Sequence, residues 1–218
     1  TNNDTTNNGT TNNGTTATVE TVTFTAVPIS GADGSLLDAE ICERGTTNCA
    51  TGTAEAVSVE VPKGVDVAIS LTVDGHMTAN WFINLEADRT YNTPLLTEET
   101  LGALSDAFGL SDDVTKGHVF LQAQDTASGI PGVAFELSPS NFELLLYNGP
   151  GGPDPSLEET STGNGAFLNI DQGNYELTGT HDTMMCSAAT GHQRSETGAA
   201  QIEIIGGEAT YAFVSCAP

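Results

Sequence analysis

The sequence predicts an all-β protein in which a short helix joins two tandem sandwich domains. Three observations support this prediction. Segments that alternate apolar with polar residues recur along the chain, and turns rich in glycine and proline separate them. A single stretch shows helical spacing instead. Finally, segments about a hundred residues apart resemble each other, which indicates an internal repeat and therefore two similar domains.

The composition favours an exported protein. The 218 residues include 29 acidic and five basic ones, which gives a formal net charge of −24. Because this charge would repel phosphate groups, it argues against nucleic acid and anionic membrane surfaces as partners. No apolar run approaches the roughly 18 residues of a membrane-spanning segment, so we expect none. An acidic surface that is poor in lysine suits a salty or extracellular medium.

Residues 1–17 are predicted to be a flexible tether. They are almost entirely Thr, Asn and Gly, so ordering them would cost entropy with no apolar burial to offset it. Asn3, Asn8 and Asn13 stand in Asn-x-Thr sequences, which accept glycans in a host that glycosylates asparagine. The tether would hold the domains off a cell surface, with a lipid anchor on residues outside this chain.

Residues 18–96 are predicted to form the first sandwich. Along 18–27 one parity is polar and the other mostly apolar, as a strand with one buried face requires. A Gly-Ala-Asp-Gly turn follows, and a Pro-x-Gly turn interrupts a later apolar segment. The predicted strands of this half lie at 18–27, at 35–42, on both sides of the turn within 56–76, and at 81–87.

Residues 97–116 are predicted to be a helical linker. Thr97 is a suitable N-cap with acidic residues in the turn after it, and Gly109 stands where a C-cap would fall. Apolar residues recur at helical spacing, at Leu101, Leu104 and Phe108. We expect this stripe to pack against a β domain rather than to bind a partner.

Residues 117–218 are predicted to form the second sandwich. The segment 117–139 repeats the order strand, turn, strand of residues 19–42, and 166–179 aligns with 57–71. The loop at 171–174 raises the question of whether it is a ligand site or a bend between two strands. Because the same loop recurs in the first half, where no ligand need be supposed, we interpret it as a bend.

The aligned turns resemble a known group of surface modules. The second half carries the pattern at Gly165, Phe167, Ile170, Gly173 and Tyr175, and the first half carries it at Val59, Val61, Pro62 and Gly64, with Val65 or Val67 where Tyr is expected. This pattern is similar to the prealbumin-like β-sandwich repeats of bacterial surface proteins, namely the carboxypeptidase-regulatory-like, transthyretin-like and Cna-B-type modules. The resemblance implies two prealbumin/Ig-like sandwiches that serve as spacers, adhesion units or carbohydrate-binding attachments.

Two kinds of cross-link come into question. Some Cna-B-type modules carry a Lys–Asn isopeptide bond, and Lys116 lies where such a lysine would sit, but the segment 208–216 offers no Asn. We therefore do not expect this bond. The four cysteines allow three disulfide pairings, and the two-domain interpretation selects Cys42–Cys49 and Cys186–Cys216. Their spacings fit no zinc site.

Metal sites receive little support. Soft ligands gather at His181, Met184, Met185, Cys186 and His192, which raises a copper hypothesis. Their order does not match a blue-copper loop and Cys186 is expected in a disulfide, so packing is the favoured interpretation. Aspartates stand in turns at Asp33, Asp74, Asp171 and Asp182, but no dense calcium motif contains them. Ca²⁺ stays a weak option and we expect no cofactor; His76 and His118 are predicted to be plain surface residues.

Catalytic motifs are absent, and one loop is a candidate for binding. Ser187 and Ser195 lack a nucleophile setting, so we expect no enzyme. The segment 141–163 is longer than an ordinary connection and places Tyr147 beside a Gly-Pro-rich run. An exposed Tyr147 would stack on a sugar or dock a partner; the alternative, which the ordinary burial of aromatic residues favours, is a hairpin excursion with Tyr147 packed inward.

The sequence therefore predicts a non-catalytic extracellular or cell-surface binding or adhesion module, with carbohydrate or a surface protein as partner. The alternative is a structural subunit of an extracellular appendage or matrix, in which sandwiches pack end to end. An enzyme or a metal carrier is the least favoured class.

Overall fold

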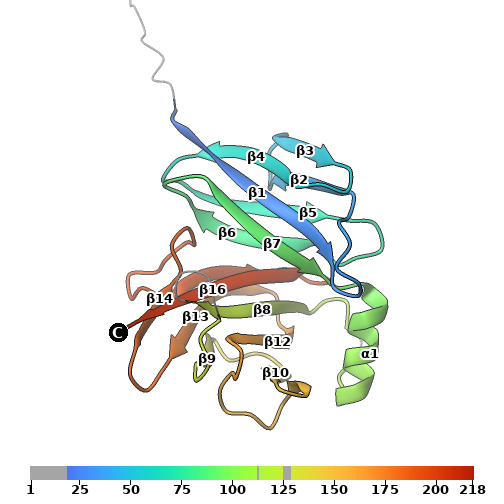
Figure 1. The fold of residues 1–218 in the computed structure, drawn as a ribbon, viewed down its shortest axis with the longest axis vertical. Helices are drawn as coiled ribbons and strands as arrows, with labels where there is room; N and C mark the ends of the chain where they lie inside the picture. Colours follow the sequence, from blue (N-terminus) through green and yellow to red (C-terminus); the bar gives the residue numbers. More distant parts are fainter. Residues whose placement is uncertain (1–18, 112, 125–128) are drawn as a thin grey trace, which may run out of the picture.

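The computed structural model describes residues 19–111, 113–124 and 129–218. Within them, strands β1 to β16 and the helix α1 form two β-sandwiches stacked one on the other (Figure 1). The tether at 1–17, with its predicted glycan acceptors Asn3, Asn8 and Asn13, lies outside the described residues.

The first sandwich packs two sheets against each other. One has the strand order β4-β1-β7, and the other β3-β2-β5-β6. The strands are β1 (Thr21–Ser30), β2 (Ala39–Glu43), β3 (Cys49–Gly52), β4 (Val57–Pro62), β5 (Asp66–Thr72), β6 (Ala79–Asn84) and β7 (Arg89–Leu95). In β1 every second side chain is buried, because that strand has one face on the core and one in solvent.

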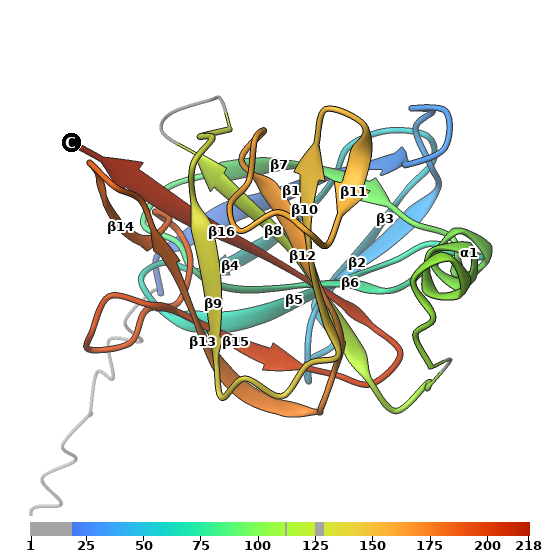
Figure 2. The ribbon, with the colours of Figure 1, turned by 90° about the horizontal axis from the view of Figure 1, so that it is seen from below.

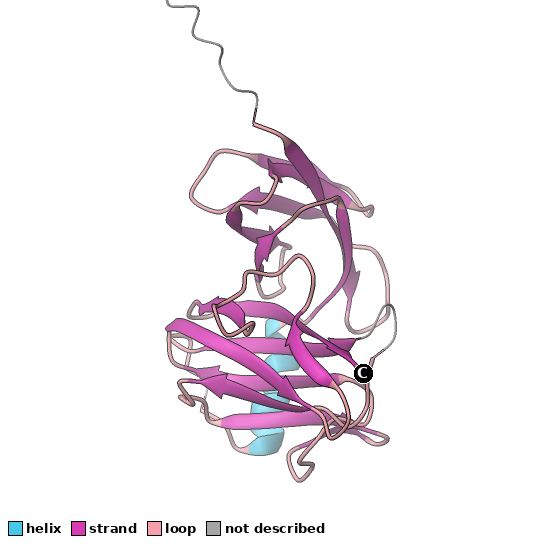
Figure 3. Ribbon diagram, turned by 90° about the vertical axis from the view of Figure 1, so that its left-hand side faces the viewer, coloured by secondary structure: helices cyan, strands magenta, loops and turns pink. Residues whose placement is uncertain are grey.

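The second sandwich also has two sheets. The order β15-β13-β9 faces β11-β10-β12-β8-β16, and β14 pairs with the end of β16. The strands are β8 (Gly117–Gln124), β9 (Ala134–Ser138), β10 (Leu144–Gly149), β11 (Gly152–Asp154), β12 (Asn164–Ile170), β13 (Gly173–Thr180), β14 (Met185–Ala188), β15 (Ala200–Ile204) and β16 (Ala209–Ala217). Figure 3 shows the two sandwiches as separate groups of strands.

Both sandwiches follow one strand plan. β1 pairs antiparallel with β4 and parallel with β7, and β8 pairs in the same way with β12 and β16. β5 lies between β2 and β6, as β13 lies between β9 and β15. This correspondence agrees with the repeat expected from the sequence. It supports our proposal that the domains span 18–96 and 117–218, with the linker at 97–116.

The turns that raised the question of a ligand site occupy equivalent places in this plan. Each carries the chain from one sheet of its sandwich to the other, from β4 to β5 and from β12 to β13. Gly64 has a φ of 67° and Gly173 a φ of 146°, conformations that side chains with a Cβ rarely adopt. The backbone therefore needs glycine in both turns, and the segment 171–174 is a bend.

The helix α1 (Glu98–Phe108) joins the halves as predicted. The Thr97 side chain accepts a hydrogen bond from the Thr100 amide at 3.0 Å, and Gly109 ends the helix with a φ of 68°. Leu101 packs against the first core, whereas Leu104 and Phe108 pack against the second sandwich. Figure 3 shows the helix alongside the second sandwich, and in Figure 2 it lies at the edge of the molecule.

A backbone pairing between β6 and β16 joins the two sandwiches. Ala79 and Asn80 pair in parallel with Ala209 and Thr210, so strands of both halves belong to one ten-stranded sheet. At the rim of this junction, the Arg44 guanidinium is 2.7 Å from a Glu208 carboxylate oxygen.

Aromatic side chains also cross the junction. Tyr211 of β16 belongs to the core of the first sandwich, where its ring lies 5.5 Å from that of Trp81 and its hydroxyl donates to the Pro94 carbonyl. His192 is buried between Tyr91 and Phe213, at 6.0 and 5.2 Å between ring centres. The two cores are therefore in contact through side chains of β16 and of the segment before β15.

Both predicted disulfides are present. Cys42–Cys49 joins the neighbouring strands β2 and β3, and Cys186–Cys216 joins β14 and β16. The prediction for His118 is wrong, because this side chain is 5% exposed, beneath the bulge of β12. Burial lowers the pKa of His118 to about 4.

Candidate binding groove between the sandwiches

A groove of about 560 Å³ opens where the second sandwich meets α1 and the end of β7. Its floor is the outer face of β10, β12, β8 and β16, the face opposite the second core. α1 forms one wall and β7 of the first sandwich forms another. In Figure 1, β7 lies directly above β16 and β8, with α1 to the right of these strands. Both sandwiches and the linker therefore contribute to one site.

Among the residues that the structure describes, the groove is lined without a single charged side chain. This is unusual for a chain with 29 acidic and five basic residues. A charged ligand would find no ion-pair partner there and would lose hydration on entry, which is costly. The lining therefore favours a neutral ligand.

Amide side chains surround an apolar floor. Gln122 and Asn164 stand on neighbouring strands, and the Gln122 amide donates to the Asn164 oxygen at 3.2 Å. The side chains of Asn92 and Asn148, both exposed, form no hydrogen bond to any described residue. Because an amide both donates and accepts, these groups suit hydroxyl groups of a ligand.

The floor offers aromatic surface. Phe120 and Tyr211 pack with ring centres 5.5 Å apart, and Phe213 is half-buried beside them. Tyr211 is only 6% exposed, so the apolar surface of the floor comes mainly from the half-buried Phe120 and Phe213. Flanked by amides, this surface suits a ligand that is apolar on its faces and polar around its edge.

Tyr147 does not point into solvent. The side chain is 2% exposed, its hydroxyl accepts a hydrogen bond from the Phe135 amide at 2.8 Å, and its ring stacks on that of Phe135. Of the two alternatives for Tyr147, the structure has the ring that packs inward, because Tyr147 faces the second core while Leu146 and Asn148 face outward. An edge of the Tyr147 ring still borders the groove, opposite Gly165, so a role in binding stays a prediction.

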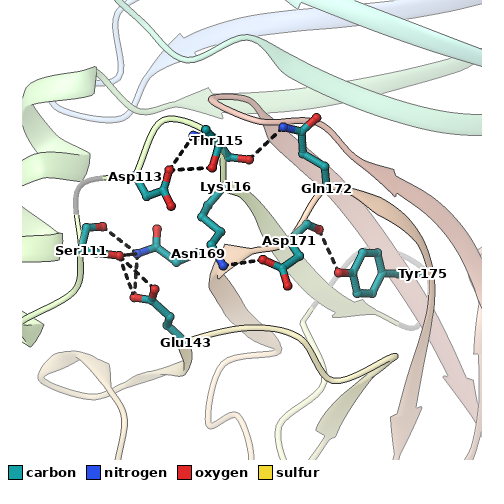
Figure 4. A network of polar contacts seen from close by, with 9 residues as sticks. All are labelled: Ser111, Asp113, Thr115, Lys116, Glu143, Asn169, Asp171, Gln172 and Tyr175. Carbon is teal, nitrogen blue, oxygen red and sulfur yellow. Dashed lines mark hydrogen bonds and ion pairs between the residues drawn. The ribbon is translucent and has the colours of Figure 1, made fainter.

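A polar network fixes the linker after α1 to the second sandwich (Figure 4). Asn169 lies at a bulge in β12 with a φ of 53°, and its amide donates to the Ser111 carbonyl at 2.7 Å and to the Glu143 carboxylate at 2.9 Å. The Ser111 hydroxyl also donates to the Glu143 carboxylate, at 2.9 Å. The hydrogen bond from Asn169, and after it the one from Ser111, holds the pKa of Glu143 below its usual value. The network thus anchors the wall of the groove that α1 forms.

Lys116 belongs to the same region and pairs with Asp171, in the turn after β12 (Figure 4). The hydrogen bond to Asp171 raises the pKa of Lys116, so its ammonium group stays protonated. The side chains of Lys116 and Asp171 remain 23% and 55% exposed. A protonated amine is a poor nucleophile, and the absence of an isopeptide bond at Lys116 stays a prediction.

The copper hypothesis finds no support in the geometry. Cys186 is bonded to Cys216, Met185 is 81% exposed, and His192 is buried at the junction. Across the described residues, the one close group of three His, Cys, Asp or Glu ligands is Glu40, Cys42 and Cys49, and its two sulfur atoms form a disulfide.

The aspartates that were predicted to stand in turns interact with different partners. Asp33 accepts hydrogen bonds from Ser35, and Asp171 pairs with Lys116. The structure does not gather them, with Asp74 or Asp182, into a common site in the part of the chain that it describes. The expectation that no cofactor is bound stays a prediction.

Comparisons with known proteins leave the family open. No known protein family matches the sequence, and no curated protein matches it. Within the described ranges, no helix is long and apolar enough to span a membrane.

Several solved structures are similar at low scores. A streptococcal ancillary pilin matches 93% of this chain over 64% of its own length, at 12% identity and a TM-score of 0.25. The shaft pilin SpaA from Lactobacillus rhamnosus GG matches 91% of this chain over 98% of its own length, at 9% identity and a TM-score of 0.28. A carbohydrate-binding module from Eubacterium rectale, in complex with maltoheptaose, matches 90% of this chain over 92% of its own length, at 12% identity and a TM-score of 0.28. At these scores the matches support no conclusion about function, and the fold rests on the strand pairing described above.

Proposed function

We propose that this chain is an extracellular binding or adhesion module that holds a neutral carbohydrate in the groove between its sandwiches. The observation that carries this proposal is the uncharged lining of amides and aromatic rings in a chain of net charge −24. Sugar rings have apolar faces and hydroxyl edges, which match this lining. The segment 1–17 would serve as the tether to a cell surface.

The groove also supports a non-catalytic role. Catalysis of proton transfer needs a positioned acid or base with a suitable pKa. In the part of the chain that the structure describes, the residues that line the groove include no Asp, Glu, His, Lys or Cys. The hydroxyl groups of its two tyrosines, Tyr147 and Tyr211, are engaged with backbone groups of Phe135 and Pro94.

A screen of the full chain against neutral and acidic glycans tests the proposal. We expect binding to neutral glycans only, and Asn92→Asp or Asn148→Asp to weaken it by about tenfold, since each places a carboxylate at the groove rim. Asn174→Asp is the matched control, because Asn174 is exposed on β13, away from the groove. Equal binding by all three variants would contradict the site.

The same preparation tests the alternative of a structural subunit. Light scattering should find particles of one chain if binding is the function. Filaments or large assemblies, with no glycan bound, would favour an appendage or matrix role instead.

A further inference from the structure

The outer face of the sheet β4-β1-β7 carries a row of hydroxyl groups. In β1 the buried side chains alternate with outward ones, and Thr25 is among the outward set. Its register places it opposite Ser58 of β4 on one side and Thr90 of β7 on the other. The Thr25 and Ser58 hydroxyl oxygens are 2.8 Å apart. Three neighbouring strands therefore present hydroxyl groups side by side.

This hydroxyl row is continuous with the groove. Asn92 and Pro94 follow Thr90 at alternate positions of β7, so they face the same side, and both line the groove. Two residues of strand span about 7 Å, which is the distance from the hydroxyl row to the groove rim. Figure 1 shows β7 between β1 and the strands of the second sandwich.

Along the described residues of β1 and β7, the surface between them is uncharged. Val27 of β1 pairs with Asn92, and Ile29 pairs with Pro94, so apolar and amide groups connect the two areas. The first charged side chains lie at the next outward position of β1. There Thr23 is opposite Glu60, and the Thr23 backbone amide donates a hydrogen bond to the Asp88 carboxylate. The neutral strip thus extends from Asn148 and Gln122 in the groove to Thr25 and ends there.

We propose that Thr25, Ser58 and Thr90 form a second subsite for the ligand that occupies the groove. A ligand that fills both areas must be neutral, rich in hydroxyl groups and longer than the groove. The partner is therefore an internal stretch of a linear neutral polysaccharide rather than a terminal sugar. This inference rests on the proposed function, because it extends the same site.

Oligosaccharide length tests the inference. The probes are neutral gluco-, xylo- and manno-oligosaccharides, each as a disaccharide and as a hexasaccharide, titrated calorimetrically into the full chain. We expect the hexasaccharide of the preferred series to bind at least about tenfold more tightly than the disaccharide, because it alone reaches both subsites.

Substitutions in the hydroxyl row test whether it causes the gain in affinity with oligosaccharide length. In the double variant Thr25→Val and Thr90→Val, the disaccharide should bind within about twofold of the wild type, and the gain with length should disappear. Valine keeps the β-branched shape that strands favour, so the fold should persist. Thr178→Val, on the exposed face of β13, is the matched control and should keep the gain.

The outcomes separate the two proposals. If disaccharide and hexasaccharide bind equally to the wild type, or if the double variant keeps the gain, the second subsite is wrong while the groove stands. If no neutral oligosaccharide binds at any length, the proposed function and this inference both fail.

Discussion

The two halves of the molecule share a strand plan but differ in the segment between its second and third shared strands. In the first half that segment is β3, which pairs with β2 and extends the sheet β2-β5-β6. In the second half it is β10 and β11, which pair with β12 and extend the opposite sheet. The second half therefore has a wide outer face beside α1, and the groove lies there. The repeated strands build the two sandwiches, and the additional strands β10 and β11 widen the face on which the groove lies.

The contact between the halves should show the largest effect on stability. Tyr211→Ala removes a ring that belongs to the first core but stands on a strand of the second half. We expect a loss of about 3–5 kcal/mol in the free energy of unfolding, measured by urea denaturation. Tyr211→Phe is the control and should lose only about 1 kcal/mol, for the bond to Pro94. Two separate unfolding transitions, with the first half unaffected, would show that the halves are independent.

Removing each disulfide in turn compares how much the two bonds stabilise their halves of the molecule. Cys186–Cys216 closes a segment with a sequence separation of 30, and Cys42–Cys49 one with a separation of seven. In the chain-entropy account, the first contributes about 3.6 kcal/mol and the second about 2.4 kcal/mol. We therefore expect the paired alanine substitution at Cys186 and Cys216 to lower the melting temperature more. An equal or reversed order would mean that other terms dominate.

The response to acid should come mainly from the second half. Burial lowers the pKa of both His118 and His192 to about 4, so the folded state binds fewer protons than the unfolded state between about pH 6.5 and pH 4. Stability is then full above pH 6.5 and falls as the pH drops through this window, by about 2–3 kcal/mol per histidine at pH 4.5. His192→Leu should reduce this fall by about half. An unchanged slope in denaturant titrations at several pH values would refute the assignment.

Replacing the glycine in each of the two equivalent turns should lower stability by similar amounts, and by less than the changes described above. Gly64→Val and Gly173→Val each force a side chain into a backbone conformation with positive φ, which costs about 1–3 kcal/mol. Gly151→Val is the control, since Gly151 has no such φ and no atom near the site of a Cβ. If Gly173→Val left the melting temperature unchanged, the structural interpretation of the 171–174 turn would fail.

Local signals in the sequence predicted their elements well. α1 begins and ends as expected, because the cap residues Thr97 and Gly109 act on the backbone beside them. β7 was not predicted, since Pro94 obscures its strand pattern and its parallel pairing with β1 is a long-range feature. The sequence patterns also do not predict the short strands β3, β14 and β15, whereas β10 and β11 form the hairpin that is one alternative for the segment 141–163.

The site was harder to foresee than the fold. Both faces of β10 are covered, one by the second core and one by α1, so its Leu-Leu-Leu-Tyr run does not alternate. The pattern therefore could not tell which way Tyr147 points. Asn92 and Asn148 come together only because β7 is placed above the second sandwich, and no local pattern records that placement.

The pairing of β16 with β6 also bears on how the chain acquires its structure during synthesis. Trp81 leaves the ribosome well before Tyr211, the ring that covers it. Until β16 has emerged, the first half keeps an aromatic face uncovered, and exposed faces of this kind invite aggregation. The part of the molecule that is made first is thus completed by the strand that is made last. A nascent chain that stops short of β16 would be a target for chaperones and proteases in both of its halves.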